Sequence, residues 1–180
     1  WVLIAGRGTS DNAATYAKYL FGAVNRLPVA LAAPSLYTTY STPPRLQNAL
    51  VLAISQSGMS PDIVAVVEDA RAQGMSTVAI TNAADSRLGQ AVEHIILCRA
   101  GEEQSIAATK TYTAELLALA MLSVALAGEK GRLDHLSALP EALSAILSVR
   151  SGPSVIATWT IVRSSAVATI MLPPPNWPSS

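Results

Sequence analysis

The sequence predicts an α/β fold in which five parallel strands form a sheet with helices on both faces. Short apolar runs alternate with stretches of helical period, which is typical of chains built from βαβ units. The third run, residues 49–54, is apolar throughout, as expected of a strand buried on both faces. The chain has 180 residues, of which 51% are hydrophobic and 13% charged, and it can bury one sizeable core.

The five expected strands share a short apolar character and are bounded by turn residues. They span residues 2–5, 28–32, 49–54, 76–81 and 94–98. The segment 37–46, which two prolines interrupt, is expected to be irregular. Before residue 151 the chain shows no internal repeat and no low-complexity tract, so the five strands belong to one domain.

Helical period and end signals predict five helices. They span about residues 11–25, 63–73, 86–91, 109–127 and 134–150. Ser10 or Asp11 is expected to cap the first of them. Gly74 and Gly128 follow the second and fourth, where glycine readily takes the backbone conformation that ends a helix. The fourth helix is apolar almost all round, so it needs cover on every side.

Charge and composition disfavour several functional classes. Twelve basic and twelve acidic residues cancel, so we expect no nucleic-acid partner. The single cysteine, Cys98, fits a reducing compartment, and we therefore expect a cytoplasmic protein in which this residue is part of the core. The longest apolar stretch, 116–127, is shorter than the roughly 20 residues of a membrane span, so no membrane partner is expected. The chain opens inside an expected strand, and no signal peptide is expected.

Polar loops follow the first, third and fourth strands. Ligands of open parallel sheets bind beyond the carboxyl ends of the strands, so residues 8–10, 55–60 and 81–82 form the candidate site. The first two loops combine hydroxyls with glycine and lead into a helix N-terminus, which suits a phosphate monoester. Plain turns and helix caps explain the same residues about equally well.

Other ligand classes fit these loops poorly. The stretch 6–8 lacks the third glycine of a dinucleotide fingerprint, and no acidic residue closes the second strand, so NAD is disfavoured. No P-loop motif occurs. His94 and His135 have neither metal-ligand nor triad spacing and are interpreted as surface or strand-edge residues. We therefore expect no cofactor and no metal.

Residues 102–111 join the last strand to the long helix. Lys110 would lie in the first turn of that helix, where a positive charge opposes the helix dipole. A salt bridge to Glu103 or Asp62 would account for it. A contact with a bound anion or with a neighbouring subunit would account for it equally.

Three motifs together resemble the sugar isomerase (SIS) domain. They are Arg-Gly-Thr-Ser at 7–10, Ser-Gln-Ser-Gly-x-Ser at 55–60 and Ile-Ala-Ala-Thr-Lys at 106–110. The resemblance is to the first half of the isomerase module of glucosamine-6-phosphate synthase, and to stand-alone tandem SIS proteins that include glucosamine-6-phosphate deaminases. It covers residues 1–150 and implies a flavodoxin-like three-layer sandwich. Met59 stands where the synthases usually carry Glu, which favours the stand-alone group.

The resemblance also implies roles for individual residues. The sugar phosphate would be held by Ser55, Gln56, Ser57 and Ser60. The sugar itself would be lined by Thr9, Ser10, Ile106 and Ala107, the last two through their backbone. Support near the site would come from Gly8, Gly58, Glu103 and Lys110. The catalytic residues stay unknown, because the acid/base groups of the family lie in a second SIS half.

The function that the resemblance implies is binding of a fructose-6-phosphate or glucosamine-6-phosphate type ligand, within an aminosugar-phosphate isomerase or deaminase. The chain is expected to bind better than it turns over. A second SIS half or a second copy is the expected partner of the helix 109–127. A non-catalytic sugar-phosphate sensor and a plain dimerisation module stay open as alternatives. A DNA-binding domain before Trp1 would favour the sensor, and a thermal shift with sugar phosphate would exclude the plain module.

The tail, residues 151–180, differs in composition from the domain before it. It contains no Asp, Glu or Lys, and its apolar residues follow neither a helix nor a strand period. Read one nucleotide out of frame, its permitted codons can encode a strand, a Gly-Arg-Gly turn and a helix that resemble the start of a second SIS half. We hypothesise a frameshift near residues 150–153. The tail is therefore expected to pack poorly against residues 1–150.

Overall fold

The structure is a computed structural model and describes residues 1–103, 108–128 and 136–148. The predicted contacts of Ile106 and Ala107, the surface position of His135 and the poor packing of the tail lie outside these residues. The chain divides into two compact units. The first contains Trp1–Gly22 and Arg26–Leu119, and the second contains Ala23–Asn25 and Ala120–Ser180.

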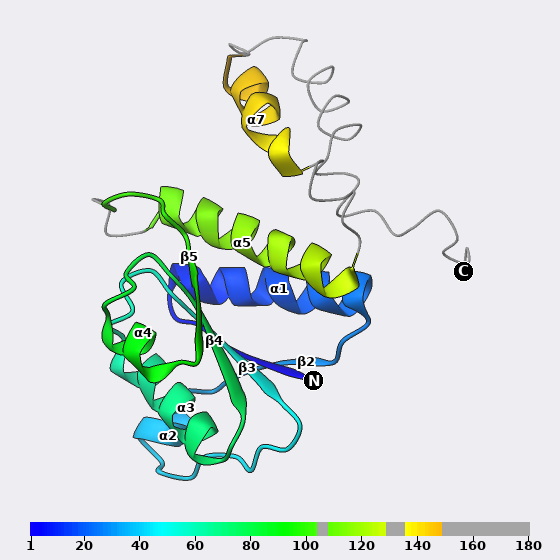
Figure 1. Ribbon diagram of the computed structural model, residues 1–180. Coiled ribbons are helices and arrows are strands. Elements are labelled where there is room, and N and C mark those ends of the chain that lie inside the picture. The colour runs from blue at the N-terminus through cyan, green and yellow to red at the C-terminus, as the bar shows by residue number, and fades with distance from the viewer. Residues whose placement is uncertain (104–107, 129–135, 149–180) are drawn as a thin grey trace. The chain divides into compact units, whose positions relative to one another are not determined.

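The sheet of the first unit has five parallel strands (Figure 1). They are β1 (Val2–Ala5), β2 (Val29–Leu31), β3 (Leu50–Ser55), β4 (Ser76–Thr81) and β5 (His94–Leu97). Their order across the sheet is β2-β1-β3-β4-β5. This is the flavodoxin-like order, in which the winding direction reverses between β1 and β3. The predicted fold class is confirmed.

The strand register brings three polar loops to one edge of the sheet. Ala5 at the end of β1 pairs with Ala53 of β3. Ser55 at the end of β3 pairs with Thr81 at the end of β4. The loops that follow these strands therefore leave the sheet at its carboxyl edge, next to the switch point between β1 and β3.

Helices cover both faces of this sheet (Figure 1). One side carries α1 (Thr9–Asn25) and the first half of α5 (Lys110–Ala127). The other side carries α2 (Ser35–Thr38), α3 (Pro61–Ala72) and α4 (Arg87–Ala91). The remaining helix of the described chain, α7 (Leu139–Ser148), belongs to the second unit.

Two local expectations are wrong. No side chain caps α1: its N-cap is Gly8, and the hydroxyl of Ser10 is directed to α5 instead of to the helix backbone. In addition, the short helix α2 forms where the chain was expected to be irregular from Tyr37 onward. Pro34 precedes it with a φ of −59°, which already has the helical value.

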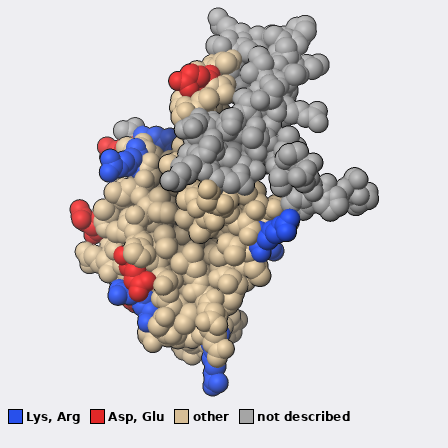
Figure 2. Space-filling view, turned by 45° about the vertical axis from the view of Figure 1, so that its right-hand side comes forward, with Lys and Arg blue, Asp and Glu red and all other residues tan. Residues whose placement is uncertain are grey.

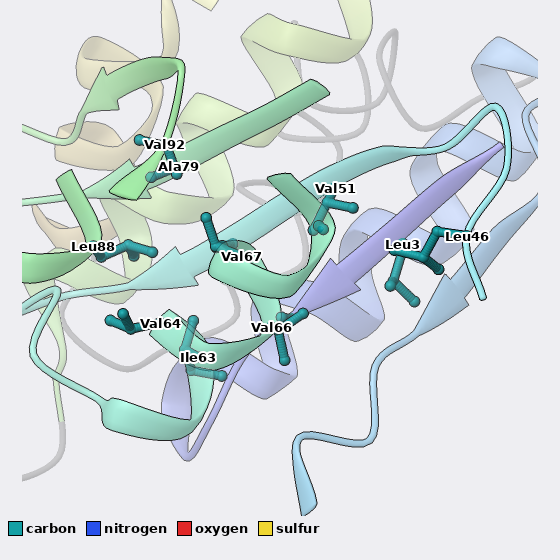
Figure 3. Close-up of a cluster of buried hydrophobic side chains, with 13 residues drawn as sticks. Leu3, Leu46, Val51, Ile63, Val64, Val66, Val67, Ala79, Leu88 and Val92 are labelled. Carbon is teal, nitrogen blue, oxygen red and sulfur yellow. The ribbon is translucent and has the colours of Figure 1, made fainter. Parts of the chain in front are cut away.

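A hydrophobic core lies between the sheet and α3 (Figure 3). Leu3 of β1, Val51 of β3, and Ile63 and Val67 of α3 belong to this core, and all four side chains are buried. Further members of this cluster are Ala5, Leu46, Ala53, Val64, Val66, Ala70, Ala79, Leu88 and Val92. Burial of such a side chain stabilises the fold by about 1.5–3 kcal/mol. The core thus anchors α3, whose N-terminus borders the candidate site.

The opposite face of the sheet carries the alternate side chains of each strand, such as Ile4 and Leu52, which are also buried. The buried face of α1 consists largely of small residues. Ala13, Ala14 and Ala17 are fully buried there. Small side chains allow α1 to approach the sheet closely, which fixes the position of the turn between β1 and α1.

The edge strand β5 is more exposed than its apolar sequence suggested. His94 is exposed, as interpreted, and Ile95 and Leu97 are each 38% exposed. On the face that Figure 2 shows, Lys and Arg and Asp and Glu lie at scattered points around a broad uncharged area. This face offers no continuous basic stripe that could follow a nucleic-acid backbone.

The helix α5 has the length and hydropathy of a membrane span, with 18 residues at a mean hydropathy of 1.3. The sequence-based expectation counted only its uninterrupted apolar stretch and so did not anticipate this. α5 nevertheless carries buried Thr111 and Glu115, and Glu115 is bonded to Ser10 of α1. Buried polar groups bonded to another helix are typical of a core helix of a folded domain.

The exposed apolar residues of α5 lead to a prediction about assembly. Leu117, Met121 and Leu126 are 39%, 48% and 48% exposed. Because a helix that is apolar all round needs cover on every side, we expect a second domain of this kind, or a second copy, to bind there. Sedimentation velocity should show association, which Met121→Glu weakens and Tyr40→Glu, a change of another exposed side chain, does not. A well-folded monomer of the unmodified chain would contradict this.

Candidate functional site

The loop between β3 and α3, residues 55–60, turns at Gly58, where the backbone conformation and the lack of space require glycine. Gly58 has a φ of +62°, and a Cβ there would lie 2.6 Å from the Cβ of Ser86 and closer still to its hydroxyl. The Ser86 hydroxyl donates to the carbonyl of Ala83 at 2.7 Å and accepts the N–H of Gly89 at 3.2 Å, so it is fixed in place. Only glycine fits at position 58.

The two serines on either side of this turn differ in exposure. Ser55 is buried, and its hydroxyl accepts the N–H of Gly58 at 3.2 Å. Ser57 is exposed, and its hydroxyl accepts the N–H of Met59 at 3.3 Å. A hydroxyl that accepts one bond can still donate another. Ser55 therefore shapes the loop, whereas Ser57 can donate to a ligand in solvent.

Backbone carbonyl groups of the loop are bonded within the protein. The carbonyl of Gln56 accepts the N–H of Asn82 at 3.0 Å and the hydroxyl of Thr81 at 3.3 Å. The carbonyl of Gly58 accepts the N–H of Leu88 at 3.0 Å. These carbonyl oxygens would repel an anion. The hydrogen bonds from Thr81, Asn82 and Leu88 keep them directed into the protein. The carbonyl of Gln56 supports the loop and its side chain is half-buried, and the expected contact of Gln56 with the phosphate stays a prediction.

The loop ends at the N-terminus of α3. Ser60 is its N-cap residue, but its side chain makes no capping hydrogen bond, and Pro61 follows at the first helical position. The free N–H groups and the dipole of a helix N-terminus attract anions. The negative charge of Asp62, in the first turn of α3, would repel a bound anion. That charge is paired with Arg7, whose Nη1 lies 2.9 Å from the Asp62 carboxylate.

The turn between β1 and α1 lies at the same edge of the sheet. Gly8 has a φ of +60° and a ψ of −125°, a region that essentially only glycine adopts. A Cβ at Gly6 would lie 2.7 Å from the backbone oxygen of Ser10. Thr9 is half-buried, so its hydroxyl can line the site, whereas Ser10 is 6% exposed and donates its hydroxyl proton to Glu115 at 2.9 Å.

The loop after β4 serves a structural purpose. The side-chain amide of Asn82 donates to the carbonyl of Gly101 at 2.7 Å, and its oxygen accepts the N–H of Ala100 at 2.9 Å. These bonds tie the segment after β5 to the carboxyl end of β4. Within the described ranges no group of three His, Cys, Asp or Glu residues could hold a metal ion.

The start of α5 is capped by an acidic residue. One carboxylate oxygen of Glu103 accepts the N–H groups of Thr109 at 3.1 Å and Thr111 at 3.2 Å. Lys110 is exposed and forms no ion pair in the part of the chain that the structure describes. Of the two explanations offered for Lys110, the salt bridge is not formed among the described residues: Asp62 pairs with Arg7, and Glu103 caps the helix. A contact with a bound anion or a neighbouring subunit stays a prediction.

Glu115 of α5, which the sequence analysis did not single out, lies near the turn between β1 and α1, where it bonds to Ser10. It is 1% exposed in the middle of α5. Burial raises its pKa from 4.5 to about 7, although the hydrogen bond from Ser10 opposes the shift. Burial raises the pKa of the half-buried Cys98 thiol to about 11, and the charge of Glu115 contributes less to the same shift. This cysteine therefore stays protonated and unreactive at neutral pH.

Comparison with known proteins gives this site a family. Residues 2–125 match the model of the SIS domain. The glutamine–fructose-6-phosphate aminotransferase (isomerizing) of Bordetella parapertussis is 39% identical over 166 residues, which cover 87% of this chain and 27% of that enzyme. The chain thus spans about a quarter of the length of such curated relatives.

Solved structures agree with the sequence comparison. A candidate phosphosugar isomerase from Silicibacter pomeroyi is 42% identical with a TM-score of 0.77, over 81% of this chain and 45% of that one. Glucosamine-6-phosphate deaminase of Thermotoga maritima shares the fold at 24% identity and a TM-score of 0.65, over 82% and 48%.

A more distant structure, at 16% identity and a TM-score of 0.63 over 84% of this chain and 57% of that one, is the Vibrio vulnificus NanR protein complexed with ManNAc-6P. Proteins of this fold thus include ones that bind sugar phosphates. The matched domain model, which covers more than half of the chain, and the 39% identity to a curated relative together show that this chain belongs to the SIS domain family of phosphosugar-binding and isomerase proteins.

Proposed function

We propose that the chain binds the phosphate group of a hexose phosphate of the fructose-6-phosphate or glucosamine-6-phosphate class. The phosphate would lie against the exposed hydroxyl of Ser57, the hydroxyl of Ser60, which makes no capping bond, and the positive end of the α3 dipole. The observation that carries the proposal is this junction of a rigid Ser-Gly turn with a helix N-terminus at the switch point of the sheet. No lysine is needed there, because hydroxyl and N–H donors suffice for a phosphate monoester.

The remaining contacts follow from the same edge of the sheet. Thr9 and Ser10 lie after β1, next to the loop after β3, and would meet the sugar. We propose that this unit works within an aminosugar-phosphate isomerase or deaminase in the cytoplasm. The relative from B. parapertussis, whose name includes both fructose-6-phosphate and isomerization, supports this substrate class. We assign the described residues to binding and none of them to proton transfer, which needs a group within reach of the reacting carbon.

Ser57→Ala tests the phosphate assignment. Removal of the hydroxyl should weaken binding of fructose-6-phosphate by about 1–3 kcal/mol, the cost of leaving a charged group without one of its partners. Affinity for unphosphorylated fructose should barely change. Isothermal titration calorimetry with both ligands measures the difference.

The matched control is Ser76→Ala, which removes an exposed hydroxyl at the amino end of β4, the opposite edge of the sheet. It should leave both affinities unchanged. Equal losses for the two ligands in the Ser57 variant, or an equal loss in the control, would contradict the assignment of residues 55–60 to phosphate.

A further inference from the structure

Three buried polar residues meet where the first turn of α1 lies against α5. The hydroxyl of Ser10 donates to one carboxylate oxygen of Glu115 at 2.9 Å. The second oxygen of Glu115 and the hydroxyl of Thr111, one helical turn away on α5, are buried and have no hydrogen-bond partner among the described residues. Thr111 is fully buried and Glu115 is 1% exposed. Buried polar atoms without partners are uncommon and indicate a function or a bound water.

Packing alone does not explain a carboxyl group at this place. A buried carboxylate is costly unless a cation or several donors compensate it. Within the described chain Glu115 forms no ion pair, and Ser10 is its one side-chain donor. An apolar residue of similar volume would fill α5 at lower cost. What distinguishes Glu115 is its bond to the first turn of α1, which follows the β1 loop.

We propose that Glu115 is a positioning residue for the sugar-binding turn after β1: its carboxylate accepts the hydrogen bond that the Ser10 hydroxyl donates, so that the Ser10 oxygen faces the ligand only as an acceptor. This inference rests on the proposed function. The ligand group at Ser10 is then a donor, either a sugar hydroxyl or the ammonium group of an aminosugar. Because Ser10 is only 6% exposed, the contact is limited to a single hydrogen bond.

The ionisation of Glu115 decides the direction of this bond. The ionised carboxylate can only accept, which fixes the Ser10 proton. The protonated carboxyl can donate to Ser10 instead and free its hydroxyl proton, so the acceptor is lost. The change falls near neutral pH, because burial raises the pKa of Glu115 to about 7. A titratable group close enough to interact with Glu115 is Cys98, just after β5, whose pKa of about 11 keeps it neutral over this range.

The test is the pH dependence of fructose-6-phosphate binding in the full chain, compared with Glu115→Gln. Glutamine keeps the size of the side chain and, like the protonated carboxyl, offers a donor to Ser10 as well as an acceptor, and it does not ionise. At about pH 5.5 the two proteins should bind fructose-6-phosphate equally well. At about pH 8.5 the unmodified protein should bind it roughly fivefold more tightly, which corresponds to about 1 kcal/mol for one hydrogen bond. Because the ligand phosphate titrates in the same way with both proteins, its effect cancels in the ratio of their affinities. Glu68→Gln, an exposed change on α3, is the control and should keep the ratio at one.

Combination with Ser10→Ala isolates the bond. In the Ser10→Ala background, Glu115→Gln should have no further effect at either pH, because the group that Glu115 positions is gone. A pH-independent affinity ratio between unmodified protein and Glu115→Gln, or an undiminished effect of Glu115→Gln in the Ser10→Ala background, would overturn the inference. Neither result would affect the phosphate site.

A measurement without ligand separates this inference from the proposed function. The side-chain carbon resonance of Glu115 in NMR should titrate near pH 7, and in Ser10→Ala its pKa should rise further, because the lost bond lowers it. An unchanged pKa in Ser10→Ala would overturn the coupling of the two residues. Absence of sugar-phosphate binding in the unmodified chain at every pH would instead overturn the proposed function, and with it the role of Ser10 toward a ligand.

Discussion

Gly58→Ala is expected to lower the free energy of unfolding by about 2–4 kcal/mol and to abolish binding of sugar phosphate. About 1 kcal/mol or more arises because an L-residue is strained at a φ of +62°. A further 1–3 kcal/mol arises from overpacking, since the added Cβ would meet Ser86 and lie 3.3 Å from the Thr81 hydroxyl. Relief of the clash would displace the turn that holds Ser57. Chemical denaturation and calorimetry measure the two losses.

Gly74→Ala provides the matched control. Gly74 ends α3 with a φ of +76°, but a Cβ there would meet nothing within 4 Å. The Gly74→Ala variant should therefore lose only about 1 kcal/mol of unfolding free energy, which is the cost of backbone strain, and keep its affinity for sugar phosphate. If both variants lost equal stability, the close approach of Gly58 to Ser86 would not be what fixes the loop.

Glu115→Gln is expected to stabilise the protein, by up to about 3 kcal/mol above pH 7. The pKa of Glu115 is raised from 4.5 to about 7 in the folded chain, and each unit corresponds to about 1.4 kcal/mol. The folded state holds this proton more tightly than the unfolded state does. The residue therefore costs no stability below about pH 4.5, and its cost grows as the pH rises to about 7.

Denaturation curves at several pH values check the sign of this effect. The difference between Glu115→Gln and the unmodified protein should be small near pH 4.5, increase up to about pH 7 and stay constant above it. Glu68→Gln, at an exposed site, should show no such trend. A pH-independent difference would mean that Glu115 ionises with its ordinary pKa, contrary to its burial.

The strands were predictable because each is a short apolar run between turn residues. All five expected strands are present, and their ends differ by at most one residue from the expected bounds. The expectation for α2 failed because a single helical turn leaves almost no periodic signal. The exposure of β5 was not anticipated, since an apolar run does not reveal that its strand lies at an edge.

The candidate site was predictable in its loops but not in their partners. The Ser-Gly composition of residues 55–60 indicated a tight turn before a helix, and Gly58 forms one. The capping role of Ser10 was wrong because a tertiary acceptor, Glu115, lies 105 residues away in the sequence. A lone carboxylate in an apolar helix was the available signal for Glu115. The partner of Asp62 was missed for a similar reason, because Arg7 is 55 residues from it.

The most direct test of phosphate binding at residues 55–60 is an amide NMR titration of the full chain with fructose-6-phosphate. We expect the largest shifts on the N–H groups of Ser57, Gly58 and Ser60 and on the first turn of α3, and we expect unphosphorylated fructose to leave these signals unmoved. Shifts of equal size with both sugars, or shifts confined to other parts of the chain such as the edge strand β5, would contradict this expectation.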